Sequence, residues 1–99
     1  MVLAIAYLKT AQGRKYLAQL CKHFAHRIEV TYDETHGECH FASGTGVLDA
    51  DDSGLRMEAS SVDAEQLGQT QAIIESHLLR FAFREEFEAL DWKNSDQAD

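Results

Sequence analysis

The sequence contains too few cysteines for a disulfide-rich protein, and its apolar runs are too short to span a membrane. Its two cysteines lack metal-knuckle spacing, and two are too few for the disulfide framework of a small secreted protein. No stretch approaches the roughly 18 to 20 apolar residues that a membrane span needs. The apolar residues 2–8 follow no basic region and precede no small-residue cleavage site, which favours a strand over a signal peptide. We therefore expect a reduced, cytoplasmic protein.

The signatures of common enzymes are also missing. There is no Gly-x-Ser-x-Gly elbow, no phosphate-binding loop and no His-Glu-x-x-His motif, and Gly44-Thr45-Gly46 is too short for a dinucleotide fingerprint. Cys39 and His40 are neighbours in an expected strand, where side chains alternate between faces, so they cannot form a nucleophile–base pair. These absences favour a binding role over catalysis.

Negative charge is absent from the first 28 residues, although the net charge of the chain is −8. No Asp or Glu precedes Glu29, whereas five basic residues do: Lys9, Arg14, Lys15, Lys22 and Arg27. The acidic whole argues against nucleic-acid binding, because it repels phosphate backbones. The basic first helix is expected to attract a small anion or an acidic partner surface; the alternative is that it packs beside the acidic parts of its own domain.

With 99 residues and 44% hydrophobic content, the chain predicts one α+β domain over residues 1–93 and a frayed C-terminal tail over 94–99. Strand formers in residues 2–9 precede Thr10, a candidate N-cap for a helix to about His26. Alternating residues between 29 and 60 indicate strands, and Asp63 with Gln66 predicts the start of a second helix. Phe87, Leu90 and Trp92 are expected to fold back as a C-terminal cover.

The predicted order is therefore β-α-β-β-β-β-α. This order favours a two-layer sandwich in which two helices cover one face of an antiparallel sheet. Phe24 and Phe81, one from each helix, are expected to be buried between the layers.

Histidines on the two predicted helices form the centre of a candidate site. His23 and His26 are three residues apart and share a helix face, whereas Cys21 lies nearly opposite His23 and cannot join the same ligand set. His77 lies on the flank of the second apolar stripe, where it would meet His23 if the helices are neighbours. His23 and His77 are candidate transition-metal ligands, and the alternative is a pair of hydrogen-bonded interface histidines.

Arginines extend this site along the second helix. Arg80 and Arg84 follow His77 at helical spacing and form a cationic face suited to a carboxylate or phosphate. The alternative is that they complement the helix dipole and pair with nearby glutamates. The candidate ligand-binding residues are His23, His26, His77, Arg80 and Arg84.

Two segments carry a family resemblance. They are Tyr16-Leu17-x-x-Leu20-Cys21-Lys22-His23-Phe24 and His77-Leu78-x-Arg80-Phe81-Ala82-Phe83-Arg84-Glu85. With them, the chain closely resembles the small bacterial proteins of the domain of unknown function 2218 family, which has no established activity. Similar domains occur fused to flavin-dependent siderophore-interacting proteins, which release iron by reduction. The resemblance implies a role in siderophore-iron utilisation and a siderophore-reductase-type partner.

The sequence thus predicts a small cytoplasmic binding or accessory domain whose ligand is a small anion or a transition metal. The alternative is a protein-interaction or homo-oligomer module with no small-molecule site, in which the basic first helix docks on an acidic surface or a second copy. A small metal-dependent enzyme is the third reading.

Overall fold

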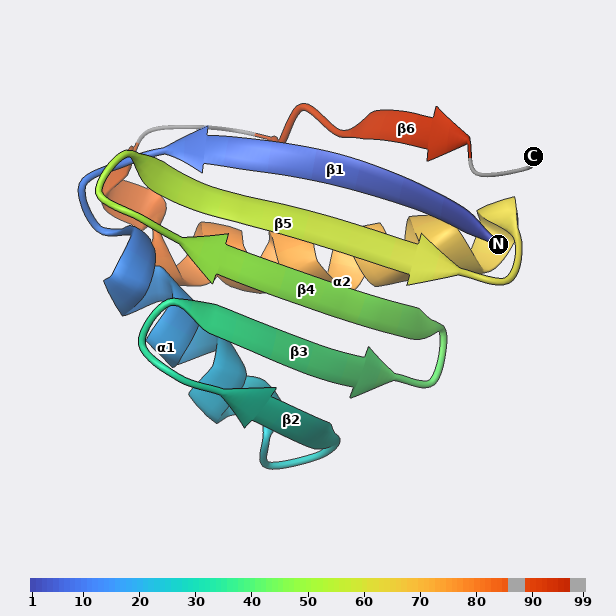
Figure 1. Ribbon diagram of the computed structural model, residues 1–99, viewed down its shortest axis with the longest axis horizontal. Helices are drawn as coiled ribbons and strands as arrows, with labels where there is room; N and C mark the ends of the chain where they lie inside the picture. Colours follow the sequence, from blue (N-terminus) through green and yellow to red (C-terminus); the bar gives the residue numbers. More distant parts are fainter. Residues whose placement is uncertain (86–88, 97–99) are drawn as a thin grey trace.

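Within residues 1–85 and 89–96, the part of the chain that the computed structural model describes, two helices cover one face of a six-stranded antiparallel sheet (Figure 1). The strand order across the sheet is β2-β3-β4-β5-β1-β6. The predicted α+β class, with both helices on the same face, is confirmed.

The elements are strand β1 (Val2–Lys9), helix α1 (Gly13–Phe24), strands β2 (Glu29–Tyr32), β3 (His36–Phe41), β4 (Gly44–Ala50) and β5 (Gly54–Ser61), helix α2 (Ala64–Phe81), the 3-10 helix η1 (Phe83–Glu85) and strand β6 (Lys93–Asp96). Strands β2 to β5 form successive hairpins. Helix α1 connects β1 with the edge strand β2, and α2 leads from β5 towards the opposite edge strand, β6. The observed order extends the predicted one by η1 and β6.

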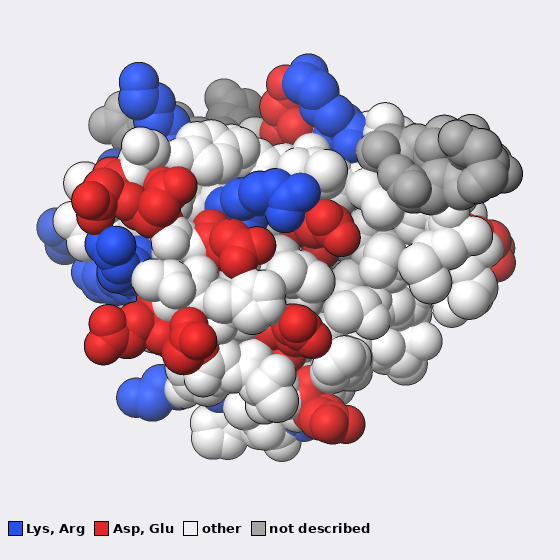
Figure 2. Space-filling model, viewed as in Figure 1, with Lys and Arg blue, Asp and Glu red and all other residues white. Residues whose placement is uncertain are grey.

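Alternation along the strands decides which face of the sheet the helices cover. On β5, Leu55, Met57 and Ala59 are buried, while Arg56 and Glu58 between them point to the other face. The polar residues of β5 therefore lie on the outer face of the sheet. Figure 2 shows acidic and basic side chains interspersed on this face. There Arg56 bonds to Glu58 at 3.1 Å, which keeps part of the charge internally paired.

Small side chains line the covered face where the helices cross it. One row across the sheet runs through Val30, Cys39, Gly46, Ala59 and Ala4. A Cβ on Gly46 would lie 2.9 Å from Cδ1 of Ile74 on α2, and one on Gly37 would lie 2.6 Å from Sγ of Cys21 on α1. Both helices therefore contact the sheet at distances that only glycine permits at these two positions.

The predicted start of α1 is wrong. The helix begins at Gly13, and Gln12 at its N-cap makes no side-chain capping bond. The Thr10 hydroxyl instead accepts a hydrogen bond from the Gln12 amide at 3.0 Å and donates one to Glu85 Oε2 at 2.9 Å. Thr10 thus stabilises a contact between distant parts of the chain, which no local pattern reveals. The predicted cap of α2 is confirmed, because Asp63 Oδ1 accepts from the Gln66 amide at 2.8 Å.

The segment after α2 is tied back onto the helices at two carboxylates. Glu85 Oε2 also accepts a hydrogen bond from the Tyr16 hydroxyl at 2.8 Å. Glu75 Oε1 accepts from the Leu90 amide at 3.2 Å and from Trp92 Nε1 at 2.9 Å. Leu90 is buried and Trp92 packs against the core, so the expected C-terminal cover is confirmed for these two residues, and Phe87 lies outside the described residues.

Residues 94–96, which were expected to belong to a frayed tail, form part of strand β6. Strand β6 pairs with β1, with Asn94 opposite Ala4 and Asp96 opposite Val2. The edge of β1 offers unpaired main-chain groups, and main-chain pairing does not require apolar side chains. A polar sequence can therefore become a strand here, and residues 97–99 lie outside the described part.

The burial expected for the two phenylalanines holds for one of them. Phe24 is buried, with 6% of its surface exposed, whereas Phe81 is only partly buried against the core.

No helix of the described residues is long and apolar enough to cross a membrane.

Replacing Gly37 by alanine should lower the free energy of unfolding by about 1 to 3 kcal/mol, because the new methyl group would press on the buried Cys21 sulfur. Gly68→Ala is the matched control: its Cβ meets nothing within 4 Å, and alanine in a helix should stabilise by up to about 1 kcal/mol. Urea unfolding followed by circular dichroism measures both. Equal stability of Gly37→Ala and the wild type would show that α1 does not need this glycine.

Candidate functional site

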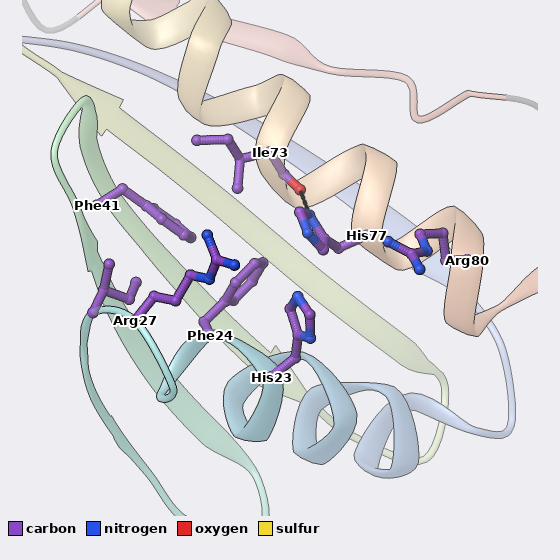
Figure 3. A pocket seen from close by; sticks show the side chains of 8 residues that line it. His23, Phe24, Arg27, Phe41, Ile73, His77 and Arg80 are labelled. Atoms are coloured by element: carbon purple, nitrogen blue, oxygen red, sulfur yellow. Dashed lines mark hydrogen bonds between the residues drawn. The ribbon is translucent and has the colours of Figure 1, made fainter.

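A pocket of about 460 Å³ lies where the C-terminal end of α1 meets the flank of α2 (Figure 3). Its lining comes from α1 and the turn after it, from the end of β3, and from α2. These residues are His23, Phe24, Arg27, Ile28, Phe41, Ile73, His77 and Arg80. Among the described residues, no acidic side chain lines this pocket.

The end of α1 places two of these side chains. The helix ends at Phe24, and the amides of Arg27 and Ile28 both donate to the Phe24 carbonyl at 3.0 Å. This tight turn holds Arg27 and Ile28 beside the last helical residue. The Arg27 guanidinium points back into the space between Phe24 and Phe41 (Figure 3). The positive charge of Arg27 therefore lies beside the apolar side chains of the pocket.

Aromatic contacts join the three regions that form the pocket. The rings of Phe24 and Phe41 meet edge to face, with centroids 4.9 Å apart at 87°. The ring centroids of Phe24 and His77 are 5.1 Å apart, and those of His23 and His77 are 4.8 Å apart. Edge-to-face pairs at these separations are favourable. The pocket is therefore built on a packed aromatic cluster rather than on loop contacts alone.

The hydrogen bond of His77 determines its tautomer. Its Nδ1 lies 2.7 Å from the carbonyl oxygen of Ile73, one turn earlier in α2 (Figure 3). Because a carbonyl oxygen only accepts, Nδ1 carries the hydrogen, and Nε2 of the neutral ring is left as an acceptor. This arrangement is typical of histidines whose second nitrogen is presented to a ligand or metal.

The surroundings of His23 disfavour its charged form. Partial burial lowers the pKa of His23 below its ordinary value of 6.5, and nearby positive charge, including that of Arg80, lowers it further. His23 is therefore largely neutral at pH 7. The fixed positive charge in the pocket comes from Arg27 and Arg80, both of which are exposed to solvent.

Three of the five predicted site residues lie together in the pocket: His23, His77 and Arg80. His26 does not line it, because α1 ends at Phe24 and the chain has turned before residue 26. Arg84 does not line it either, because α2 ends at Phe81 and Arg84 lies on η1, 5.4 Å above the ring of Phe83. Helical spacing was extrapolated beyond the true helix ends in both cases.

Sequence reasoning missed four lining residues and named one only for its charge. Ile28, Phe41 and Ile73 were not singled out as site residues, and Phe24 was expected only as core. Arg27 was counted with the basic residues of the first helix. No sequence signal identified them as pocket residues, because the pocket is formed by the turn after α1 and by the packing of α1, β3 and α2.

Metal binding at His23 and His77 stays a hypothesis. In the described residues, no group of three or more His, Cys, Asp or Glu side chains is arranged to hold a metal ion. The histidine pair supplies two nitrogen ligands, whereas protein zinc sites use three or four protein ligands. The described residues therefore do not form a complete zinc site by themselves.

Comparisons with known proteins place the chain among bacterial proteins of undescribed activity. The family described as "Uncharacterized protein conserved in bacteria (DUF2218)" matches residues 5–93. The NMR structure of PA4090 from Pseudomonas aeruginosa is similar, with a TM-score of 0.76 and 26% sequence identity over 96% of each chain. A comparison with curated proteins found no match.

The His23 side chain should titrate with a midpoint below 6.5, since partial burial and nearby positive charge both favour its neutral form. Arg80→Gln should raise this midpoint, because it removes one of the repelling charges. NMR titration of the imidazole carbon-bound protons measures the change. Arg84→Gln is the control and should leave the midpoint unchanged. An unaltered His23 titration in Arg80→Gln would contradict this electrostatic description of the pocket.

Proposed function

Because the chain belongs to the DUF2218 family, whose description assigns no activity, we propose from its geometry that it binds a small organic anion with an apolar body in the pocket between α1 and α2. The anionic group, a carboxylate or a similar group, lies at Arg27 and Arg80. The apolar body lies against Phe24, Phe41 and Ile73.

One observation supports this proposal above the others: two guanidinium groups and two imidazoles share a pocket with aromatic and aliphatic walls. Guanidinium groups bind carboxylates through paired, charge-assisted hydrogen bonds. Ligand sites are mostly apolar pockets of about 300 to 1,000 Å³ with a few polar groups that orient the ligand. A volume of about 460 Å³ lies within this range.

A second candidate function follows from the basic residues of α1 and of the turn after it. Arg14 pairs with Asp52 at 2.8 Å, but Lys15, Lys22 and Arg27 form no ion pair with any carboxylate of the described residues. Their charge is available to attract an acidic partner surface or a second copy of the chain. This interaction-module reading remains the alternative to small-anion binding.

The setting implied by the sequence resemblance stays a prediction. It places the protein in siderophore-iron utilisation, beside a siderophore-reductase-type partner; the cytoplasmic location expected from the composition also stays a prediction. An anion-binding pocket is compatible with this setting, because many iron chelators carry carboxylate or other oxygen-rich groups. Metal analysis of the untagged protein as purified is the direct test of the iron link.

An amphipathic carboxylate such as 2-naphthoate should bind in the pocket, and the double variant Arg27→Gln/Arg80→Gln should weaken binding by about tenfold or more. Charge-assisted hydrogen bonds of about 1.5 to 3 kcal/mol are lost, and about 1.4 kcal/mol corresponds to tenfold in affinity. Isothermal titration calorimetry and amide NMR shifts measure affinity and location.

Two controls accompany this measurement. The uncharged analogue naphthalene-2-methanol should bind more weakly than 2-naphthoate, and Arg84→Gln should bind 2-naphthoate as the wild type does. Absence of any 2-naphthoate-dependent shift at residues around the pocket would refute small-anion binding there.

Binding of 2-naphthoate should tighten as the pH falls from about 8 to about 6. A bound anion stabilises the protonated form of His23 and raises its pKa in the complex, so binding takes up a proton. His23→Gln should bind with a flat pH dependence over this range. His40→Gln, at an exposed position on β3, is the matched control and should keep the wild-type slope. A wild-type slope in His23→Gln would assign the proton to another group.

A further inference from the structure

The pocket continues along α2 beyond its cationic end. A second hollow shares Ile28, Phe41 and Ile73 with the first and is lined in addition by Ala42, Ser43, Gln66 and Gln69. Because three residues line both hollows, the two adjoin along α2, and together they are called the groove. The groove follows the flank of α2 from Arg80, near the C-terminal end of the helix, to Gln66, near its N-terminal end.

The length of this groove exceeds what a compact small molecule would occupy. Gln66 and Arg80 are about 21 Å apart along the helix axis, at about 1.5 Å of rise per residue. An extended peptide advances about 3.3 Å per residue, so about six residues span the same distance. The groove is therefore dimensioned for a short extended segment of polypeptide.

The chemistry of the lining changes along the groove in three steps. Arg80 lies at one end beside the two histidines, Ile28, Phe41 and Ile73 form an apolar middle, and the Arg27 guanidinium reaches in between Phe24 and Phe41. The far end presents the side-chain amides of Gln66 and Gln69. A primary amide both donates and accepts hydrogen bonds, which complements peptide groups.

The far end is also held in place by a buried hydroxyl cluster. Ser43 Oγ lies 2.8 Å from Thr70 Oγ1, and Thr70 Oγ1 donates to the Gln66 carbonyl at 3.0 Å. Thr70 is fully buried and lies 3.2 Å from Ser61 Oγ as well. The turn between β3 and β4 is thereby fixed against the first turns of α2, so the amide end of the groove is preformed.

We propose that the groove captures the C-terminal segment of a partner polypeptide. This inference rests on the proposed function and specifies its ligand. The terminal carboxylate lies at Arg27 and Arg80, apolar side chains of the last residues lie in the middle, and upstream peptide groups bond to Gln66 and Gln69. Recognition of a terminal carboxylate with apolar neighbours is an established mode of peptide binding. A fatty acid would fit less well, because its apolar end would meet the two amides.

The test compares ligands of different length and end group. A hexapeptide, acetyl-Gly-Gln-Ser-Leu-Ile-Phe with a free carboxylate, should bind at least about tenfold more tightly than acetyl-Ile-Phe. The same hexapeptide with a C-terminal amide should bind at least about tenfold more weakly than the free acid. Fluorescence anisotropy or calorimetry measures the affinities, and NMR shifts locate each ligand in the groove.

Variants at the amide end separate this proposal from simple anion binding. Gln66→Ala/Gln69→Ala should reduce the hexapeptide affinity to that of acetyl-Ile-Phe and leave acetyl-Ile-Phe and 2-naphthoate unchanged. Gln71→Ala is the matched control, since Gln71 lies on the same helix and lines neither hollow, and it should have no effect.

The outcomes distinguish the two levels of the proposal. If 2-naphthoate binds but the hexapeptide gains nothing over acetyl-Ile-Phe, the peptide assignment is wrong and small-anion binding stands. Tighter binding of dodecanoate than of the hexapeptide would also overturn it, in favour of a fatty acid. If neither 2-naphthoate nor acetyl-Ile-Phe binds, both the proposed function and this inference fail.

Discussion

The close approach of both helices to one narrow sheet face is the constraint on which the rest of the structure depends. The covered face is lined at the crossing points by glycine, alanine and cysteine, and the Gly37 and Gly46 positions leave no room for a methyl group beneath Cys21 and Ile74. With the helices so close to the sheet, Leu17, Leu20, Leu48 and Met57 become fully buried. Close packing of this kind stabilises a small domain that has only one core.

The groove is a geometric consequence of this packing. Helix α1 is shorter than α2 and ends at Phe24, after which the chain turns away to the edge strand β2. The flank of α2 beyond His77 towards its N-terminus therefore has no helix beside it, and the end of β3 forms the opposite wall. Aromatic contacts among Phe24, Phe41 and His77 close the bottom of the groove. The proposed binding groove thus lies beyond the end of α1, where α2 is no longer covered by a second helix of the described residues.

The open face of the sheet and the helix-covered side of the molecule carry different arrangements of charge. The open face of the sheet holds an exposed network in which His36 lies 2.6 Å from Asp49 and Arg56 lies 3.8 Å from the same carboxylate. Asp49, followed by Glu38, raises the pKa of His36, so this network is stabilising below pH 6.5 and loses that stabilisation as the pH rises through the raised pKa. The groove on the helical side instead gathers cations, and no acidic side chain of the described residues lines it.

The fold and three of the eight residues that line the candidate site could be predicted from local patterns in the sequence. These patterns depend on residues two to four positions apart, so they can be recognised in the sequence. They are the alternation in β3 to β5, the apolar stripes of the two helices and the Asp63 cap. They were enough to place His23, His77 and Arg80 at one helix–helix contact. They were not enough to place His26 and Arg84, since both lie beyond the helix ends at Phe24 and Phe81.

Tertiary structure alone decided the remaining features. Strand β6 exists because the edge of β1 offers main-chain partners to a polar segment far away in sequence. Arg27, Phe41 and Gln69 line one groove because a turn, a strand end and a helix flank converge in space, and their sequence separations carry no period that could reveal this. The sequence by itself determined the elements other than η1 and β6, the layers and the family; only the packed chain determined the shape of the groove and the order of charge, apolar surface and amides along it.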